Sequence, residues 1–184
     1  MHRFFLTLSH VMAWAGGAML CLLILLTCVS VLGRGLNGFL HSTEGFGLSA
    51  WLLGLGIGPV TGDFELVEAG IAFTIFAFLP LCQITGSHAS VDIFTARWPD
   101  RANRWRQMLT DVVFAGVLVL IAVQLAAGTA SKLSTGQTTF MLQFPLWWAY
   151  ALSLVGAGVA ALVSLYIAGM RVVELVQGRD GAAS

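Results

Sequence analysis

Charged residues are scarce in this chain. Its 184 residues include nine Lys and Arg and nine Asp and Glu, together 10% of the sequence, whereas a soluble domain carries about 25%. The two signs cancel to a net charge of zero, so the chain lacks the basic surface with which proteins bind nucleic acid. Hydrophobic residues reach 58%. These proportions argue against a water-soluble fold and against nucleic acid as a partner.

Reactive and metal-binding patterns are missing as well. The three cysteines all lie in apolar stretches, no Cys-x-x-Cys pair occurs, and no disulfide framework can be drawn. The sequence contains no HExxH, Walker or Gly-x-Ser-x-Gly motif. Its four histidines are too few to supply the paired axial ligands of a di-haem helix bundle. We therefore expect no catalytic residue, no metal and no cofactor, and a protein that is not an enzyme.

The chain has instead four long apolar runs. Each contains a little over twenty residues, enough for a helix to cross the ~30 Å hydrocarbon core of a bilayer. Only two charged residues, Glu68 and Asp111, fall inside a run, and each lies within a turn of its end, because charge is costly at mid-bilayer. The sequence predicts an all-α polytopic membrane protein, a single membrane domain over residues 1–184. The predicted spans are 11–33, 66–86, 110–130 and 146–169.

Basic residues fall mainly on one side of these spans. The side that holds both termini and the 87–109 loop carries seven of the nine, and the other side carries only Arg34 and Lys132. Cytoplasmic loops are enriched in Lys and Arg, so we expect both termini in the cytoplasm. The first run is longer than the core of a signal peptide, and we expect it to be a retained anchor.

The first outer loop contains an unusual apolar segment, Gly45–Gly58. It has fourteen residues, five of them glycine, and is too short to span the bilayer and poor in helix propensity. It predicts an interfacial helix or a partner contact, with a re-entrant segment as the alternative. Arg34 and Glu65 close the two ends of this loop at one membrane surface. We expect these two residues to pair with each other, or each to meet a partner charge.

Two groups of polar residues mark the inner loop. His88 and Asp92 are four residues apart; two ligands without a third are a weak metal site, and a hydrogen bond that fixes an interfacial turn is the simpler interpretation. A collar of arginine and tryptophan suits the headgroup layer and is expected to contact lipid or a partner. Its members are Arg97, Trp98, Arg101, Arg104 and Trp105.

The segment 65–99 resembles the signature of a transporter family. Glu65-Leu66 begins the second span, Gly86-Ser87-His88 and Val91-Asp92 follow, and Pro99 closes the loop. This order and spacing resemble the small, DctQ-type membrane subunit of tripartite ATP-independent periplasmic (TRAP) transporters. The exit of the first span, with Arg34, and the entry to the fourth, 138–152, are similar to the same family. The stretch 41–63 looks like an insertion.

The resemblance implies a non-catalytic subunit of an organic-acid uptake system in the bacterial inner membrane. Its expected partners are a large M-type permease subunit, a periplasmic substrate-binding protein and membrane lipids. Uptake would be symport driven by an ion gradient, with sodium as the expected ion, and the small subunit would brace the static scaffold of the large one. Two alternatives from the residues stay open: a small self-contained transporter or channel, and a membrane anchor for a redox enzyme.

Overall fold

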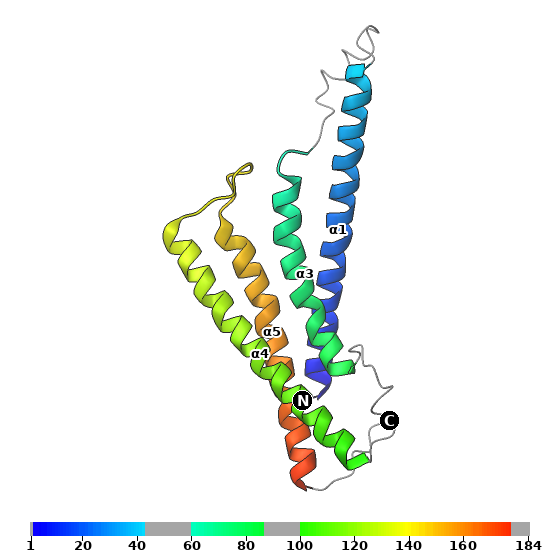
Figure 1. Ribbon diagram of the computed structural model, residues 1–184, viewed down its shortest axis with the longest axis vertical. Coiled ribbons are helices and arrows are strands. Elements are labelled where there is room, and N and C mark those ends of the chain that lie inside the picture. Colours follow the sequence, from blue (N-terminus) through cyan, green and yellow to red (C-terminus); the bar gives the residue numbers. More distant parts are fainter. Residues whose placement is uncertain (1, 43–59, 87–99, 178–184) are drawn as a thin grey trace.

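The computed structural model describes residues 2–42, 60–86 and 100–177 (Figure 1). Four helices in this part of the chain are long and apolar enough to cross a membrane, so the predicted all-α membrane fold is confirmed. Three of the helices contain a whole predicted span and extend well beyond it, and the other covers its predicted span except for Gly86. The segment Gly45–Gly58, for which an interfacial helix was expected, lies outside the described residues. The helices are α1 (His2–Ser42), α3 (Asp63–Thr85), α4 (Asp100–Thr135) and α5 (Leu146–Gln177).

The helices run alternately up and down (Figure 1). We call the end of the molecule where α1 ends and α3 begins the upper end, and the opposite end the lower end. α1 has 41 residues, about 60 Å at the rise of an α-helix, and it extends past the start of α3 (Figure 1). The loop between α4 and α5 also lies at the upper end.

The four helices form an open row in the order α4, α5, α3, α1. α5 packs against both α4 and α3, and α3 packs against α1. α1 touches α5 only slightly, near the lower end, where Phe5 stacks on Tyr166 with ring centroids 4.3 Å apart. The row therefore consists of two helix pairs, α1–α3 and α4–α5, joined mainly through α3 and α5.

Small residues allow neighbouring helices to approach closely. A Cβ added to Gly16 of α1 would lie 2.9 Å from the Ala77 Cβ of α3, and one added to Gly156 of α5 would lie 2.9 Å from the Phe76 Cβ. Ala157 and Ala160 on the same side of α5 are fully buried. Close packing of small residues is how helices associate in lipid, where burial of apolar surface gives no driving force.

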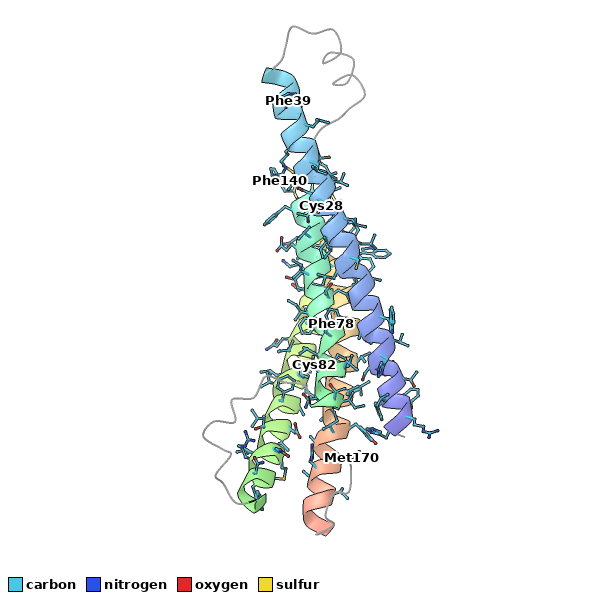
Figure 2. All side chains as sticks on the ribbon, turned by 90° about the vertical axis from the view of Figure 1, so that its right-hand side faces the viewer. Cys28, Phe39, Phe78, Cys82, Phe140 and Met170 are labelled. Atoms are coloured by element: carbon cyan, nitrogen blue, oxygen red, sulfur yellow. The ribbon has the colours of Figure 1, made fainter. Side chains whose placement is uncertain are left out.

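Large apolar side chains point away from these seams. Trp14 of α1 and Val123 of α4 are mostly exposed, and Figure 2 shows side chains projecting outward along much of the length of the helices. Cys21 and Cys28 of α1 are also exposed. Such a surface is stable against lipid or another membrane protein but not against water.

Candidate functional site

The upper end of α3 holds α1 through a polar cluster. Asp63, the first residue of α3, accepts hydrogen bonds from the Ser30 hydroxyl and from the Arg34 guanidinium of α1. Ser30 is fully buried, whereas the side chains of Asp63 and Arg34 are 16% and 58% exposed. A second Asp63 oxygen accepts the Phe64 backbone N–H. We call Ser30, Arg34 and Asp63 the α1–α3 clasp.

The expected pairing of Arg34 with Glu65 is therefore wrong. Arg34 forms its ion pair with Asp63, two residues earlier in the chain. Side chains two residues apart on a helix point to different faces, so the carboxylate of Asp63 faces α1 while that of Glu65 faces the other side of α3. Arg34 does meet an opposite charge at this surface, but the charge belongs to its own chain.

Glu65 holds the loop between α4 and α5. Its two carboxylate oxygens accept the backbone N–H groups of Met141 and Leu142, at 2.7 and 3.0 Å. Leu142 in turn packs over Gly62, whose left-handed φ of 78° precedes α3. We call this contact the loop clasp. It connects the start of α3 to a segment more than seventy residues away in the sequence.

The loop that Glu65 holds is a short hairpin. Thr138 and Pro145 form a β-bridge, and the Thr139 backbone N–H donates to the Phe144 carbonyl at 2.8 Å. Gln143 has a positive φ of 55°, which a non-glycine residue adopts mainly in tight turns. The hairpin presents Phe140, labelled in Figure 2, almost fully exposed at the upper end.

A second polar network joins three helices toward the lower end. Asp111 of α4 accepts a hydrogen bond from the Gln83 amide of α3 at 3.5 Å, and the Arg171 guanidinium of α5 lies 3.5 Å from its other oxygen. Gln83 is buried near the end of α3, which stops at Gly86 with a left-handed φ of 63°. This network links α3 to α4, which share no close backbone packing.

Polar side chains deeper in the spans mostly bond to their own helix. The hydroxyls of Thr27 and Thr74 donate to carbonyls four residues earlier, an arrangement that satisfies them without a partner helix. Gln124 lies exposed on α4. α3 continues through Pro80, which is fully buried. Among the described residues, no Asp, Glu, Lys, Arg or His lies near the middle of a span.

Only some of the inner-loop residues singled out from the sequence lie among the described residues. His88, Asp92, Arg97 and Trp98 lie outside the described residues. Arg101 and Arg104 fall on the first turns of α4, but their side chains are not described. Trp105 is exposed on α4, as a residue in contact with headgroups or a partner would be.

Sequence reasoning missed Asp63 and Ser30, and it did not assign roles to Gln83, Asp111 or Arg171. One usable signal was present for the clasp: Ser30 and Arg34 are four residues apart and therefore share a helix face. Acidic residues are favoured in the first turn of a helix, and both Asp63 and Glu65 lie there. The sequence therefore did not show which of the two pairs with Arg34. For the lower network, the sequence showed Asp111 as an acid inside an apolar run. It did not indicate that Gln83 and Arg171 are its partners.

Comparison with known families identifies this chain. The family model described as "Tripartite ATP-independent periplasmic transporters, DctQ component" matches residues 23–175. The chain belongs to the DctQ family. The match runs from the middle of α1 almost to the end of α5 and includes both clasps and the lower network, and the predicted resemblance is confirmed. A search of curated proteins and a search of solved structures each returned no match.

The chain is thus a membrane component of a transporter. Neither clasp carries a constellation suited to bond-making chemistry: in each, the carboxylate serves as a fixed hydrogen-bond acceptor that joins two segments. The α1–α3 clasp joins α1 to α3, and the loop clasp joins the hairpin to α3.

The loop clasp makes a specific prediction. In Glu65→Gln the charge is lost and only one carbonyl oxygen remains for two backbone donors. A hydrogen bond to a charged acceptor is stronger than one to a neutral amide, so we expect hydrogen exchange at the Met141 and Leu142 amides to accelerate about tenfold. Glu68→Gln, one turn farther along α3, removes an exposed carboxylate and should leave both amides unchanged. Equal acceleration in the two variants would contradict the clasp.

Proposed function

We propose that this DctQ component braces the static part of a large M-type permease subunit in a secondary TRAP transporter. Uptake of organic acids is driven by an ion gradient, with sodium as the coupling ion, and the substrate is delivered by a periplasmic binding protein. Membership of the DctQ family supports this proposal. The substrate and the ion pass through the large subunit and not through this chain.

The observation that carries the proposal is the open row of helices, in which the mid-span threonine hydroxyls bond to their own helices. A chain that moves its own substrate needs polar or charged groups, or broken helices, near the membrane midplane. The described mid-span hydroxyls of Thr27 and Thr74 bond to their own helices. The α1–α3 clasp, the loop clasp and the Asp111 network lie toward the upper and lower ends of the helices. Such an arrangement favours a support over a pathway.

The open row also leaves broad surfaces for a partner. α1 and α4 each pack against one neighbour along most of their length, so most of their apolar side chains remain exposed. A brace needs a surface of this kind, and a rigid one. The α1–α3 clasp and the loop clasp supply rigidity at the upper end, and the Asp111 network supplies it toward the lower end.

We further propose an orientation for the chain, which forms one domain in the bacterial inner membrane. The lower end, where α1 begins and α5 ends, faces the cytoplasm, because seven of the nine basic residues lie on that side. The arginine and tryptophan collar then lies at the cytoplasmic headgroups, where each cation near anionic lipid contributes about 1 kcal/mol. His88 and Asp92 lie in the same inner loop and are proposed to fix its turn.

Assembly tests the proposal. When the whole transporter is produced in cells and extracted with mild detergent, this chain should migrate with a much larger membrane subunit at equal stoichiometry. The chain reconstituted alone in vesicles should give no uptake under a sodium gradient, whereas the complex with its binding protein should. A stable homo-oligomer of this chain that transports substrate alone would overturn the brace.

A further inference from the structure

A cavity of about 450 Å³ lies between α3 and α5 at the upper end. It is lined mainly by apolar side chains of these two helices, by Leu125 of α4 and by the hairpin residues 139–144. Pockets that bind small molecules have volumes of about 300–1,000 Å³. The cavity lies within the span region of α3 and α5, at the level of one lipid leaflet.

The structure defines both ends of this cavity. At its floor, α3 and α5 come together where Gly156 packs on Phe76, so the helices leave no room below that level. At its roof is the hairpin, held in place by the carboxylate of Glu65. The space between is therefore bounded below by the close approach of α3 and α5 and above by the hairpin.

Two polar groups in the lining have no partner among the described residues. Ser153 is 3% exposed, and its hydroxyl forms no hydrogen bond, although a buried unsatisfied hydroxyl costs about 1–3 kcal/mol. Glu68 lies in the lining closer to the upper end, is exposed, and forms no described ion pair. A ligand that fills the cavity would have to satisfy a hydroxyl donor deep inside and an acidic group above it.

The separation of these two groups along the membrane normal can be estimated. α3 and α5 both run downward, and Gly156 is level with Phe76 and Ala77, so Ser153 is level with about Phe73. That position is five residues below Glu68, or roughly 7.5 Å at the rise of an α-helix. In a phospholipid, the ester carbonyls of the glycerol lie below the headgroup, on the side of the acyl chains.

We propose that this cavity binds one phospholipid whose head carries an ammonium group, as phosphatidylethanolamine does. The ammonium pairs with the Glu68 carboxylate, an ester carbonyl accepts the Ser153 hydroxyl, and a hydrocarbon chain lies against Ala72 and Phe76. A fatty acid or an anionic lipid fits less well, because the acidic groups Glu65 and Glu68 line the cavity near its upper end. The site is a property of this chain alone and does not depend on the proposed brace.

Lipid retention tests this site. The full-length chain is reconstituted in vesicles that contain equal amounts of phosphatidylethanolamine and phosphatidylglycerol with identical acyl chains. It is then extracted in mild detergent, and the bound lipid is counted by mass spectrometry. We expect about one phosphatidylethanolamine per chain, retained about fivefold over phosphatidylglycerol, a preference typical of one ion pair near a surface. No preference for either lipid would overturn the proposal.

Three variants assign the contacts. Glu68→Gln should abolish the preference between the two headgroups, and Ser153→Ala should reduce retention about fivefold through loss of one hydrogen bond. Ala72→Leu should narrow the cavity where the hydrocarbon chain lies and reduce retention. Ala127→Leu, on an exposed face of α4 outside the cavity, should behave as the wild type. If Ala72→Leu does not fold, Glu68→Gln and Ser153→Ala still test whether the lipid binds in this cavity.

Other occupants would be detected in the same material. Retention that is unchanged in both Glu68→Gln and Ser153→Ala would show that lipid binds elsewhere and would overturn the assignment. So would a cross-link from Glu68→Cys to a segment of the large subunit in the assembled transporter, with no lipid retained there. Phosphatidylethanolamine that is retained in both the isolated chain and the complex, and whose retention falls about fivefold in Ser153→Ala, would support it.

Discussion

Replacing Gly156 with valine should separate the two halves of the helix row. A Cβ at this position would lie 2.9 Å from the Phe76 Cβ and 3.4 Å from the Phe76 carbonyl carbon, so the α3 backbone must move and a flexible side chain cannot absorb the clash. Overpacking of this kind costs about 1–3 kcal/mol. With the larger figure, we expect the thermal unfolding midpoint in detergent to fall by about 10 °C.

Gly158 offers a matched control on the same helix. A Cβ added there meets no atom within 4 Å, so Gly158→Val makes the same change in helix propensity without the clash. We expect its unfolding midpoint to stay near that of the wild type. Because α1–α3 and α4–α5 are joined mainly through α3 and α5, Gly156→Val should also weaken association with the large subunit. Equal unfolding midpoints for the two variants would contradict close packing at Gly156.

Reversing the charge of Arg34 should be rescued from Asp63 and not from Glu65. Arg34→Glu places a second carboxylate beside Asp63 and the buried Ser30 hydroxyl. The arginine side chain is exposed, which makes the cost smaller than that of reversing a buried pair, and we expect the unfolding midpoint to fall by about 5 °C. Arg34→Glu with Asp63→Arg restores opposite charges between the same two helices.

The rescue should be partial, because an arginine at the first position of α3 opposes the helix dipole. Recovery of about half the lost stability is therefore the expected result. The double variant Arg34→Glu with Glu65→Arg is the control: it leaves two acids together at the α1–α3 clasp and also breaks the loop clasp. It should be less stable than Arg34→Glu alone. Better recovery through Glu65 than through Asp63 would contradict the observed pairing.

The spans and the fold class could be read directly from the chain. Each apolar run is long enough to cross a bilayer, and lipid excludes charge so strongly that the positions of the eighteen charged residues delimit the spans, although the helices themselves continue beyond them. The segment around Glu65 and Gly86 was likewise sufficient to indicate the DctQ family. These features are encoded locally, in runs and short motifs, and they need no knowledge of which helix touches which.

The contacts that shape the candidate site were decided by the tertiary structure. Arg34 could have paired with either acid in the first turn of α3, and only the rotation of that helix about its axis turns Asp63 to α1 and Glu65 to the hairpin. The partners of Glu65 are backbone N–H groups, which every residue carries, so no side-chain pattern marks them. Likewise, the cavity between α3 and α5 exists because the helices meet at Gly156 and are capped by the hairpin. Helix rotation and crossing depend on packing summed over many residues, and for that reason a local pattern predicts the spans but not the faces that they share.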